Sequence, residues 1–175
     1  MKKIFISFLT LTAACASAQV AIGKTTVSSP SVSLEFYDGS DNAKGFTLPW
    51  VTSANNVANA VDGTMIFDSN DRKTKLRDKG QWKDLTGTDS GIVDLTLQNG
   101  ITEKAEAKVQ IGGNPQTDTT SGILVLADTS KAMVLPKVAN PHLTIINPEP
   151  GTMAYDTVKK QLAIYNGKDW SFWKP

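Results

Sequence analysis

The hexapeptide Gly63–Asp68 (GTMIFD) decides the fold, because the chain of 175 residues contains it twice. It returns as Gly151–Asp156 (GTMAYD), 88 residues later. The same spacing continues without a gap from the hexapeptide to a pair of tryptophans, Trp82 and Trp170. A match that keeps its register over such a stretch indicates an internal repeat.

Two further blocks extend the repeat towards the N-terminus. Lys44–Val51 (KGFTLPWV) returns as Lys131–Val138 (KAMVLPKV), and Val20–Gly23 (VAIG) returns as Val109–Gly112 (VQIG). The offsets of these blocks are 87 and 89 residues, too close to 88 for coincidence. The chain therefore divides into repeat one at 20–85, a connecting β segment at 86–108 and repeat two at 109–173.

The hydrophobic pattern of both repeats predicts β-strands. Ser31–Tyr37 alternates, with Val32 and Leu34 on one predicted face and Ser33 and Glu35 on the other. Each repeat then ends in a predicted meander of a strand, a turn, a second strand, a turn and a tryptophan. This pattern predicts an all-β protein made of two homologous β-meander units.

The connector has strand and turn signals of its own. Val93–Leu97 alternates between apolar and polar residues, and Asn99-Gly100 is a dipeptide typical of tight hairpin turns. Ser53–Ala60 has the composition of a short helix, whereas Pro141 predicts that repeat two lacks that helix. A hairpin-rich connector between the two units is therefore expected.

A unit of this size is marginally stable alone. A chain of about 65 residues buries only ~60% of its unfolded surface. The single cysteine, Cys15, excludes an intramolecular disulfide. We therefore expect each unit to pack against its sister repeat or against other copies of the chain.

The first eighteen residues predict export. Lys2 and Lys3 precede the largely apolar stretch 4–14, and Ala16-Ser17-Ala18 supplies small residues for cleavage, so 1–18 is expected to be a secretory signal peptide. The alternative is a lipid anchor at Cys15, which follows Thr12-Ala13-Ala14. The longest later apolar run, Ile123–Ala127, is too short to cross a bilayer, so no membrane span is expected.

Charge and residue inventory disfavour several classes of function. A net charge of +1 lacks the basic excess of a nucleic-acid binder. His142 is the one histidine, so a zinc site would need carboxylate ligands. No serine-nucleophile motif accompanies His142 as a possible base, and no phosphate-binding motif is present. We expect a protein that is not an enzyme and that holds no cofactor and no metal.

Acidic loops are the nearest approach to a cation or catalytic site. Asp38–Asn42 and Asp68–Asp71 are rich in oxygen ligands, but neither follows the EF-hand pattern, so both are interpreted as turns. Asp68 and Asp156 occupy equivalent places in the two repeats. Their duplication favours a structural role over a carboxylate-based hydrolase.

The aromatic residues divide into packing and contact candidates. Trp82, Trp170 and Tyr165 lie in the predicted meanders and are expected to be structural. Trp50 corresponds to Lys137 in repeat two, so it is predicted to be free for contact with a ligand or partner. Trp173 is the second candidate for such a contact.

These motifs resemble those of secreted β-repeat proteins of the Bacteroidota. The resemblance rests on Gln19–Gly23, Lys44–Pro49, Gly63–Asp68 and the YNG-x-x-W pattern of Tyr165–Trp170. Leu97–Gly113 is similar to segments of phage tail-fibre-like proteins of the same bacteria. The resemblance implies an extracellular or surface β-structure, with a trimer of intertwined chains favoured.

Two functions follow as hypotheses. The first is a secreted, non-catalytic structural or adhesive surface protein that acts as a fibre-like scaffold and a homo-oligomer. The alternative is a glycan-binding module that uses exposed aromatic residues. A surface protein is a further expected partner.

Overall fold

A computed structural model describes residues 19–96, 98–102, 104 and 107–174. The predicted signal peptide at 1–18, the lipid-anchor alternative at Cys15 and residue Leu97 lie outside the described residues. Short strands dominate the described chain, together with a 3-10 turn η2 (Ala54–Asn56) and one turn of helix α2 (Pro141–Thr144). The strands are β1 (Val20–Ile22), β2 (Val32–Phe36), β3 (Phe46–Thr47), β4 (Trp50–Val51), β5 (Met65–Asp68), β6 (Lys73–Asp78), β7 (Gln81–Asp84), β8 (Val109–Ile111), β9 (Leu124–Leu126), β10 (Ala132–Val134), β11 (Lys137–Val138), β12 (Thr152–Asp156), β13 (Gln161–Tyr165) and β14 (Trp170–Trp173).

Two sheets repeat the same meander. The order β4-β5-β6-β7 in the first matches β11-β12-β13-β14 in the second, and in both a parallel pair is followed by two antiparallel pairs. The cross-strand partner of Met65 is Leu76, and that of Met153 is Ile164. The all-β fold with two homologous β-meander units is therefore confirmed.

A parallel strand pair precedes each meander. β1 pairs with β2 and β8 pairs with β9, and the two strands of each pair are parallel. One expectation about β2 is wrong, because Ser33 and Glu35 on its predicted polar face are as buried as Leu34. The polar face of β2 can be buried because other parts of the chain supply polar partners: Ser28 donates to Glu35, and Asp128 accepts from Ser33.

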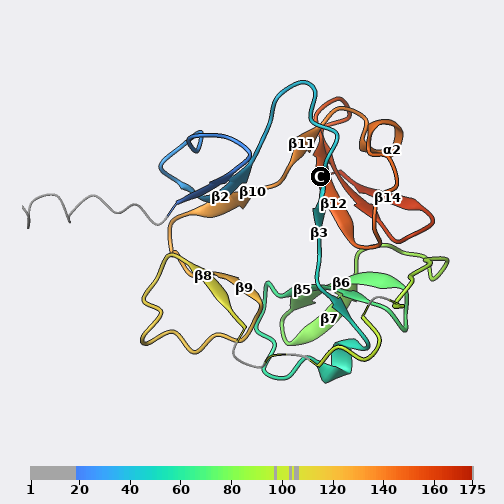
Figure 1. Ribbon diagram of the computed structural model, residues 1–175, viewed down its shortest axis with the longest axis horizontal. Helices are drawn as coiled ribbons and strands as arrows, with labels where there is room; N and C mark the ends of the chain where they lie inside the picture. Colours follow the sequence, from blue (N-terminus) through green and yellow to red (C-terminus); the bar gives the residue numbers. More distant parts are fainter. Residues whose placement is uncertain (1–18, 97, 103, 105–106, 175) are drawn as a thin grey trace, which may run out of the picture.

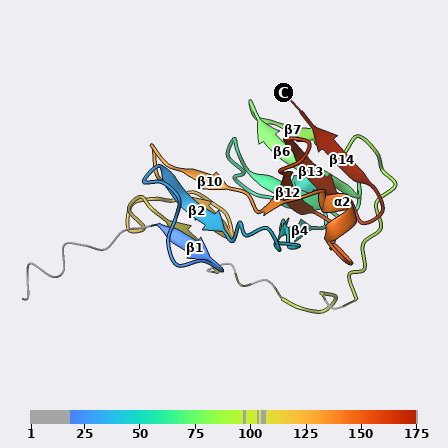
Figure 2. The ribbon, with the colours of Figure 1, turned by 90° about the horizontal axis from the view of Figure 1, so that it is seen from above.

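The two units exchange strands. β3 of the first unit pairs with β12 of the second, and β10 of the second unit pairs with β2 of the first. Figure 1 shows β3 descending beside β12, while β10 lies beside β2 at the other side of the molecule. Figure 2 also shows β10 beside β2, seen from above. The units are therefore interlocked rather than strung in sequence.

The hydrophobic core lies where the units meet. Leu48 from the first unit is buried against Met153 and Ile164 of the second unit. Partly buried apolar side chains from both units surround this cluster: Phe46, Met65, Leu85 and Leu162. Neither unit completes this core without the other.

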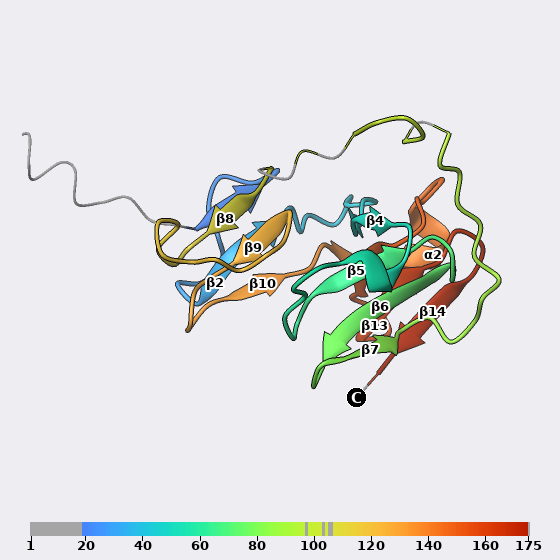
Figure 3. The ribbon, with the colours of Figure 1, turned by 90° about the horizontal axis from the view of Figure 1, so that it is seen from below.

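The connector differs from its predicted hairpin. Val93–Thr96 is not a strand, because Asp94 accepts a hydrogen bond from the backbone N–H of Thr96 (2.9 Å), which turns the chain. Asn99-Gly100 forms a turn, but no strand of the described connector flanks it. Figure 3 shows the connector running along the outside of the molecule before it reaches β8.

The start of the connector is fixed to the second unit. The side chain of Ser171 donates to the carbonyl of Thr86 (2.6 Å). A Cβ atom at Gly91 would lie 2.4 Å from the carbonyl oxygen of Asn166 and 2.7 Å from that of Arg72. Glycine is needed here because the connector passes closely between one hairpin turn of each unit.

The prediction that Pro141 prevents a helical turn in repeat two is wrong. Pro141 begins helix α2, and the first unit has its own 3-10 turn at Ala54–Asn56. Proline is favoured at the first helical position, where its missing N–H would have no partner within the helix. Both units therefore have a helical turn between their fourth and fifth strands.

Candidate functional site

The contact between the two units, here called the unit junction, consists of two strand pairings, β3 with β12 and β10 with β2. On one side of it, Thr47 lies opposite Thr152, and their hydroxyl oxygens are 3.3 Å apart. Next to this pair, the N–H of Leu48 donates to the carbonyl of Gly151 (3.1 Å). A Cβ atom at Gly45 would lie 2.4 Å from the Thr152 side chain, so the two backbones approach closely.

The other side of the unit junction is the parallel contact of β10 with β2. The N–H of Ala132 donates to the carbonyl of Ser31 (2.8 Å), and Met133 lies opposite Leu34. The register shifts between Ala132 and Met133, which is a bulge in the ladder. The side chain of Ser33 also donates to Asp128 (3.3 Å), which helps to satisfy the buried polar face of β2.

A chain of charges also joins the two units. Lys24 Nζ lies 3.3 Å from buried Glu35 and 2.9 Å from Asp38, and Lys137 of the second unit lies 3.3 Å from Asp38. Burial raises the pKa of Glu35, but the N–H of Ser28 (2.6 Å) and the Lys24 ammonium outweigh it, so the pKa is lowered overall. The hydrogen bond from Lys24 is the main cause that lowers the pKa of Asp38. Glu35 therefore stays ionised inside the fold.

Trp50 lies within the unit junction, which corrects the prediction that its side chain is free. Its indole N–H donates to the carbonyl of Pro150 in the second unit (2.6 Å). Its ring packs against Phe67 at a centroid distance of 6.4 Å. Trp50 and Lys137 hold equivalent positions in the repeats but face different neighbours, because Trp50 contacts Pro150 whereas Lys137 pairs with Asp38. A contact of Trp50 with an external partner stays a prediction.

Trp173 lies at the other candidate contact, an open apolar groove. The groove has a volume of about 480 Å³, and its apolar lining includes Leu135, Tyr155, Leu162 and Trp173. Trp173 is 47% exposed, and its indole N–H donates to the carbonyl of Leu85. The structure thus places Trp50 and Trp173 in different surroundings and does not bring them together in one aromatic platform.

The remaining aromatic residues form equivalent cross-strand pairs. Tyr165 lies opposite Trp170, with ring centroids 5.2 Å apart. At the equivalent place, the guanidinium of Arg77 lies 5.5 Å from the ring of Trp82. Arginine replaces tyrosine here and keeps an attractive contact, because a cation binds the face of an aromatic ring.

The buried aspartates Asp68 and Asp156 hold the turns of the two meanders. Asp68 accepts hydrogen bonds from Lys75 Nζ (2.9 Å) and from the N–H of Ala54 (2.8 Å). Asp156 accepts from the N–H groups of Val158 (2.9 Å) and of Lys159 (3.1 Å). Burial raises the pKa of each carboxyl, but these hydrogen bonds outweigh burial and lower it overall.

The acidic loops are occupied by partners within the chain. Asp41 accepts from the Tyr37 hydroxyl (2.7 Å), and Asp71 pairs with Lys75. No group of three or more histidine, cysteine, aspartate or glutamate residues in the described parts of the chain could hold a metal ion. His142 is exposed in α2 and packs edge-on against Phe172.

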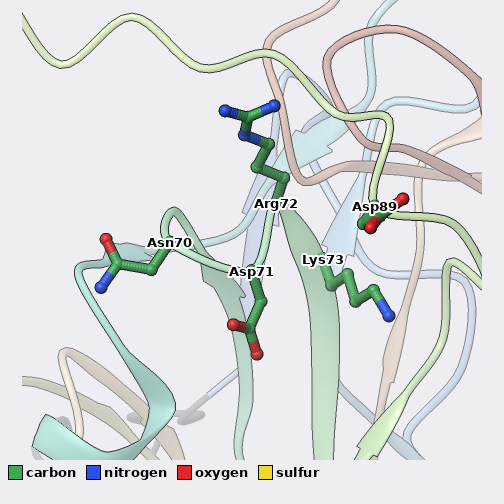
Figure 4. Close-up of a pocket in the computed structure, with 5 residues that line it drawn as sticks. All are labelled: Asn70, Asp71, Arg72, Lys73 and Asp89. Carbon is green, nitrogen blue, oxygen red and sulfur yellow. The ribbon is translucent and has the colours of Figure 1, made fainter.

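A polar hollow of about 440 Å³ lies at the turn between β5 and β6. Figure 4 shows its lining residues Asn70, Asp71, Arg72, Lys73 and Asp89. Lys73 Nζ is bound to Asp84 (3.0 Å), so its charge is already neutralised. The lining carries both signs of charge, so it selects neither an anion nor a cation.

Comparison with known proteins gives one family match. Residues 111–174, less than half of the chain, match the family described as the phage tail like trimerisation region. The match covers most of repeat two, including β11 to β14 and the groove at Trp173. No curated protein and no solved structure matches the chain.

The match and the fold agree on a coarse description. An all-β chain that matches a trimerisation region over 111–174 fits a fibre-like structural protein, and the match supports a homo-oligomer and is consistent with a role other than catalysis. Among the described residues, no helix is both long and apolar enough to span a membrane.

Proposed function

We propose that the chain is an exported, non-catalytic scaffold protein that forms a homotrimer and acts at the cell surface or outside the cell, in a structural or adhesive role. The observation that carries this proposal is the match of residues 111–174 to a trimerisation region. That stretch includes strands β11 to β14, which are four of the five strands of their sheet, the fifth being β3 of the first unit.

The physical character of the chain supports the same proposal. Its core lies between units, and its carboxylates are bound by lysines and backbone N–H groups rather than gathered in a cleft. A short-stranded β-protein with exposed apolar residues such as Ile123 and Val109 needs neighbours to cover them. Other copies of the chain are the neighbours that a trimerisation region supplies.

Subunit mixing tests the trimer. Tagged and untagged full-length chains are co-expressed, purified through the tag and separated by native mass spectrometry. A trimer gives assemblies with one, two and three tags, whereas a dimer gives only one and two. Recovery of tagged chains without untagged partners would contradict the proposal.

Protease treatment of intact cells tests the location. A surface protein is cleaved by protease added outside the cells, while a cytoplasmic control protein is spared. N-terminal sequencing of the purified chain tests cleavage after Ala18 against processing at Cys15. Resistance of the chain in intact cells with full sensitivity after lysis would overturn the surface location.

Glycan binding is a second candidate, and the groove at Trp173 favours it. Trp173 and Tyr155 are half-exposed aromatic residues that line one apolar hollow, which is a surface on which a sugar ring can stack. A glycan array probed with the wild-type chain and with Trp173→Ala tests this candidate. Binding that is lost in the variant supports it, and absence of binding to any glycan on the array contradicts it.

A further inference from the structure

The first unit has an open strand edge where the second unit has a covered one. β5 pairs with β6 along one edge, and β4 covers only Phe67 and Asp68 on the other. In the second unit, the equivalent strand is β12, and β3 pairs with the part of its edge that β11 leaves open. Gly151–Met153 is therefore buried. Gly63–Met65 is exposed or half-exposed, and no strand of the described chain lies on its free edge.

The second unit has the strand that would fit this edge. By the repeat, Met133–Leu135 is the equivalent of Phe46–Leu48, which covers Gly151–Met153. The N–H of Ala132 points to β2, and because backbone groups alternate along a strand, those of Met133 and Leu135 face the opposite edge. Leu48 is buried in the core, whereas Leu135 is only half-buried and lines the open groove.

A second open surface lies beside the first. In the parallel pairs, Leu34 lies opposite Val20 and Leu124 lies opposite Val109, so Ser33 of β2 corresponds to Ile123. Ser33 is 0% exposed because β10 lies beside β2, but Ile123 is 58% exposed. The exposed residue just before β9 therefore corresponds to the part of β2 that a strand from the other unit covers.

We propose that a second copy of this chain fills both open surfaces by repeating the unit junction between chains. Met133–Leu135 of one copy pairs antiparallel with Gly63–Met65 of the next, and Phe46–Thr47 of that next copy lies parallel to β9 of the first. This inference rests on the homotrimer proposed above and specifies its interface. Such a contact is head-to-tail, and it forms a closed ring when the rotation between copies closes.

The two junctions differ at one point. Gly45 approaches Thr152 closely, and its equivalent in repeat two is Ala132. The extra methyl group of Ala132 holds the strands of the chain-to-chain junction slightly further apart at this position. Ala132→Gly is therefore expected to tighten the assembly.

Disulfide cross-linking tests the proposed pairing. Thr47 and Thr152 face each other across the strands, and their equivalents in the chain-to-chain junction are Val134 and Thr64. Directly opposed residues of this kind have Cα atoms about 4.5 Å apart, within the range that a disulfide bridges. The experiment uses full-length chains with Cys15→Ser, which contain no other cysteine.

Chains with Thr64→Cys and chains with Val134→Cys are co-expressed and oxidised. The proposal predicts a disulfide-linked dimer that joins residues 64 and 134, identified by mass spectrometry, while neither variant alone cross-links. Thr47→Cys with Thr152→Cys in one chain is the positive control and forms a bond within the chain. Lys131→Cys, three residues before Val134, replaces Val134→Cys in the register control and gives no link.

The mass of the unoxidised assembly separates the two ways of failing. If the control bond forms and the assembly has the mass of three chains, but residues 64 and 134 do not link, the proposed interface is wrong and the homotrimer stands. If the mass is not that of three chains, the homotrimer is wrong, and a monomer also excludes the proposed interface.

Discussion

At the scale of single residues, the fold depends on carboxylates that are buried and ionised. Asp156 is fully buried, and its oxygens accept hydrogen bonds from backbone N–H groups of the following turn. Asp156→Asn replaces an acceptor by an amide that turns donor hydrogens towards other donors. We expect a loss of about 1–3 kcal/mol in the free energy of unfolding. Thermal melting measures it, with exposed Asp89→Asn as the control; equal melting of the two variants would contradict the assignment.

The same carboxylates predict how stability depends on pH. The pKa values of Asp68, Asp156 and Glu35 are lowered in the fold, so the unfolded chain binds more protons than the folded one as pH falls. Their contribution is complete above the ordinary value, 3.8 for aspartate, and is lost as pH falls through the lowered values. Urea unfolding between pH 7 and pH 2 measures this loss. An unfolding free energy that stays constant down to pH 2 is the opposite result.

Trp50 gives a third prediction at this scale. Trp50→Ala removes the hydrogen bond to Pro150 and the packing against Phe67, so it loosens the unit junction. Because Trp50 is half-buried, we expect a loss of about 2 kcal/mol, below the range for a fully buried tryptophan. Chemical denaturation measures it, with Trp173→Ala as the more exposed comparison. A variant as stable as wild type would show that Trp50 does not contribute to the junction.

At the scale of strands and turns, Gly45 controls the contact between the units. Its φ angle is not left-handed, so alanine is excluded by space alone: a Cβ atom would lie 2.9 Å from the carbonyl oxygen of Met153. Gly45→Ala therefore pushes β3 away from β12, with an expected loss of about 1–3 kcal/mol. Thermal melting checks this against Lys44→Ala at the exposed neighbouring position. A wild-type melting temperature in Gly45→Ala would mean that β3 does not pair with β12.

The meanders were predictable from the sequence because their signals are local. The hexapeptides Gly63–Asp68 and Gly151–Asp156 each form a strand with its own hairpin partner a few residues away. The connector failed as a prediction because Asp94 caps its own turn, which competes with an extended strand. The helical turn at Pro141 was missed because proline was read as a breaker rather than as a first residue.

The candidate site was less predictable than the elements. The pairings of β3 with β12 and of β10 with β2 join segments about a hundred residues apart, and short strands of two or three residues have no pattern that specifies a distant partner. The repeat itself was the signal that could have found them. Ser33 corresponds to Ile123, and a polar residue on one copy of a strand against an apolar residue on the other indicates different surroundings.

At the scale of the whole molecule, the chain consists of two interlocked copies of one unit, and each copy has a surface that the other copy does not cover. The unit junction covers the edge of β12 and leaves the equivalent edge of β5 open, and it covers Ser33 of β2 while the equivalent Ile123, just before β9, is exposed. A repeat of this kind grows by adding further units at its open ends. The trimerisation-region match at 111–174 and these open surfaces point to assembly with other copies of the chain.

Sedimentation equilibrium of the purified chain, over a concentration series around one micromolar, tests this account most directly. A homotrimer has a mass three times that of one chain, unchanged at the higher concentrations. We also expect Met133→Pro to shift the distribution towards smaller species, because the N–H of Met133 faces the edge that pairs with the next chain and proline removes that N–H. A wild-type chain that sediments as a monomer at every concentration would contradict the account.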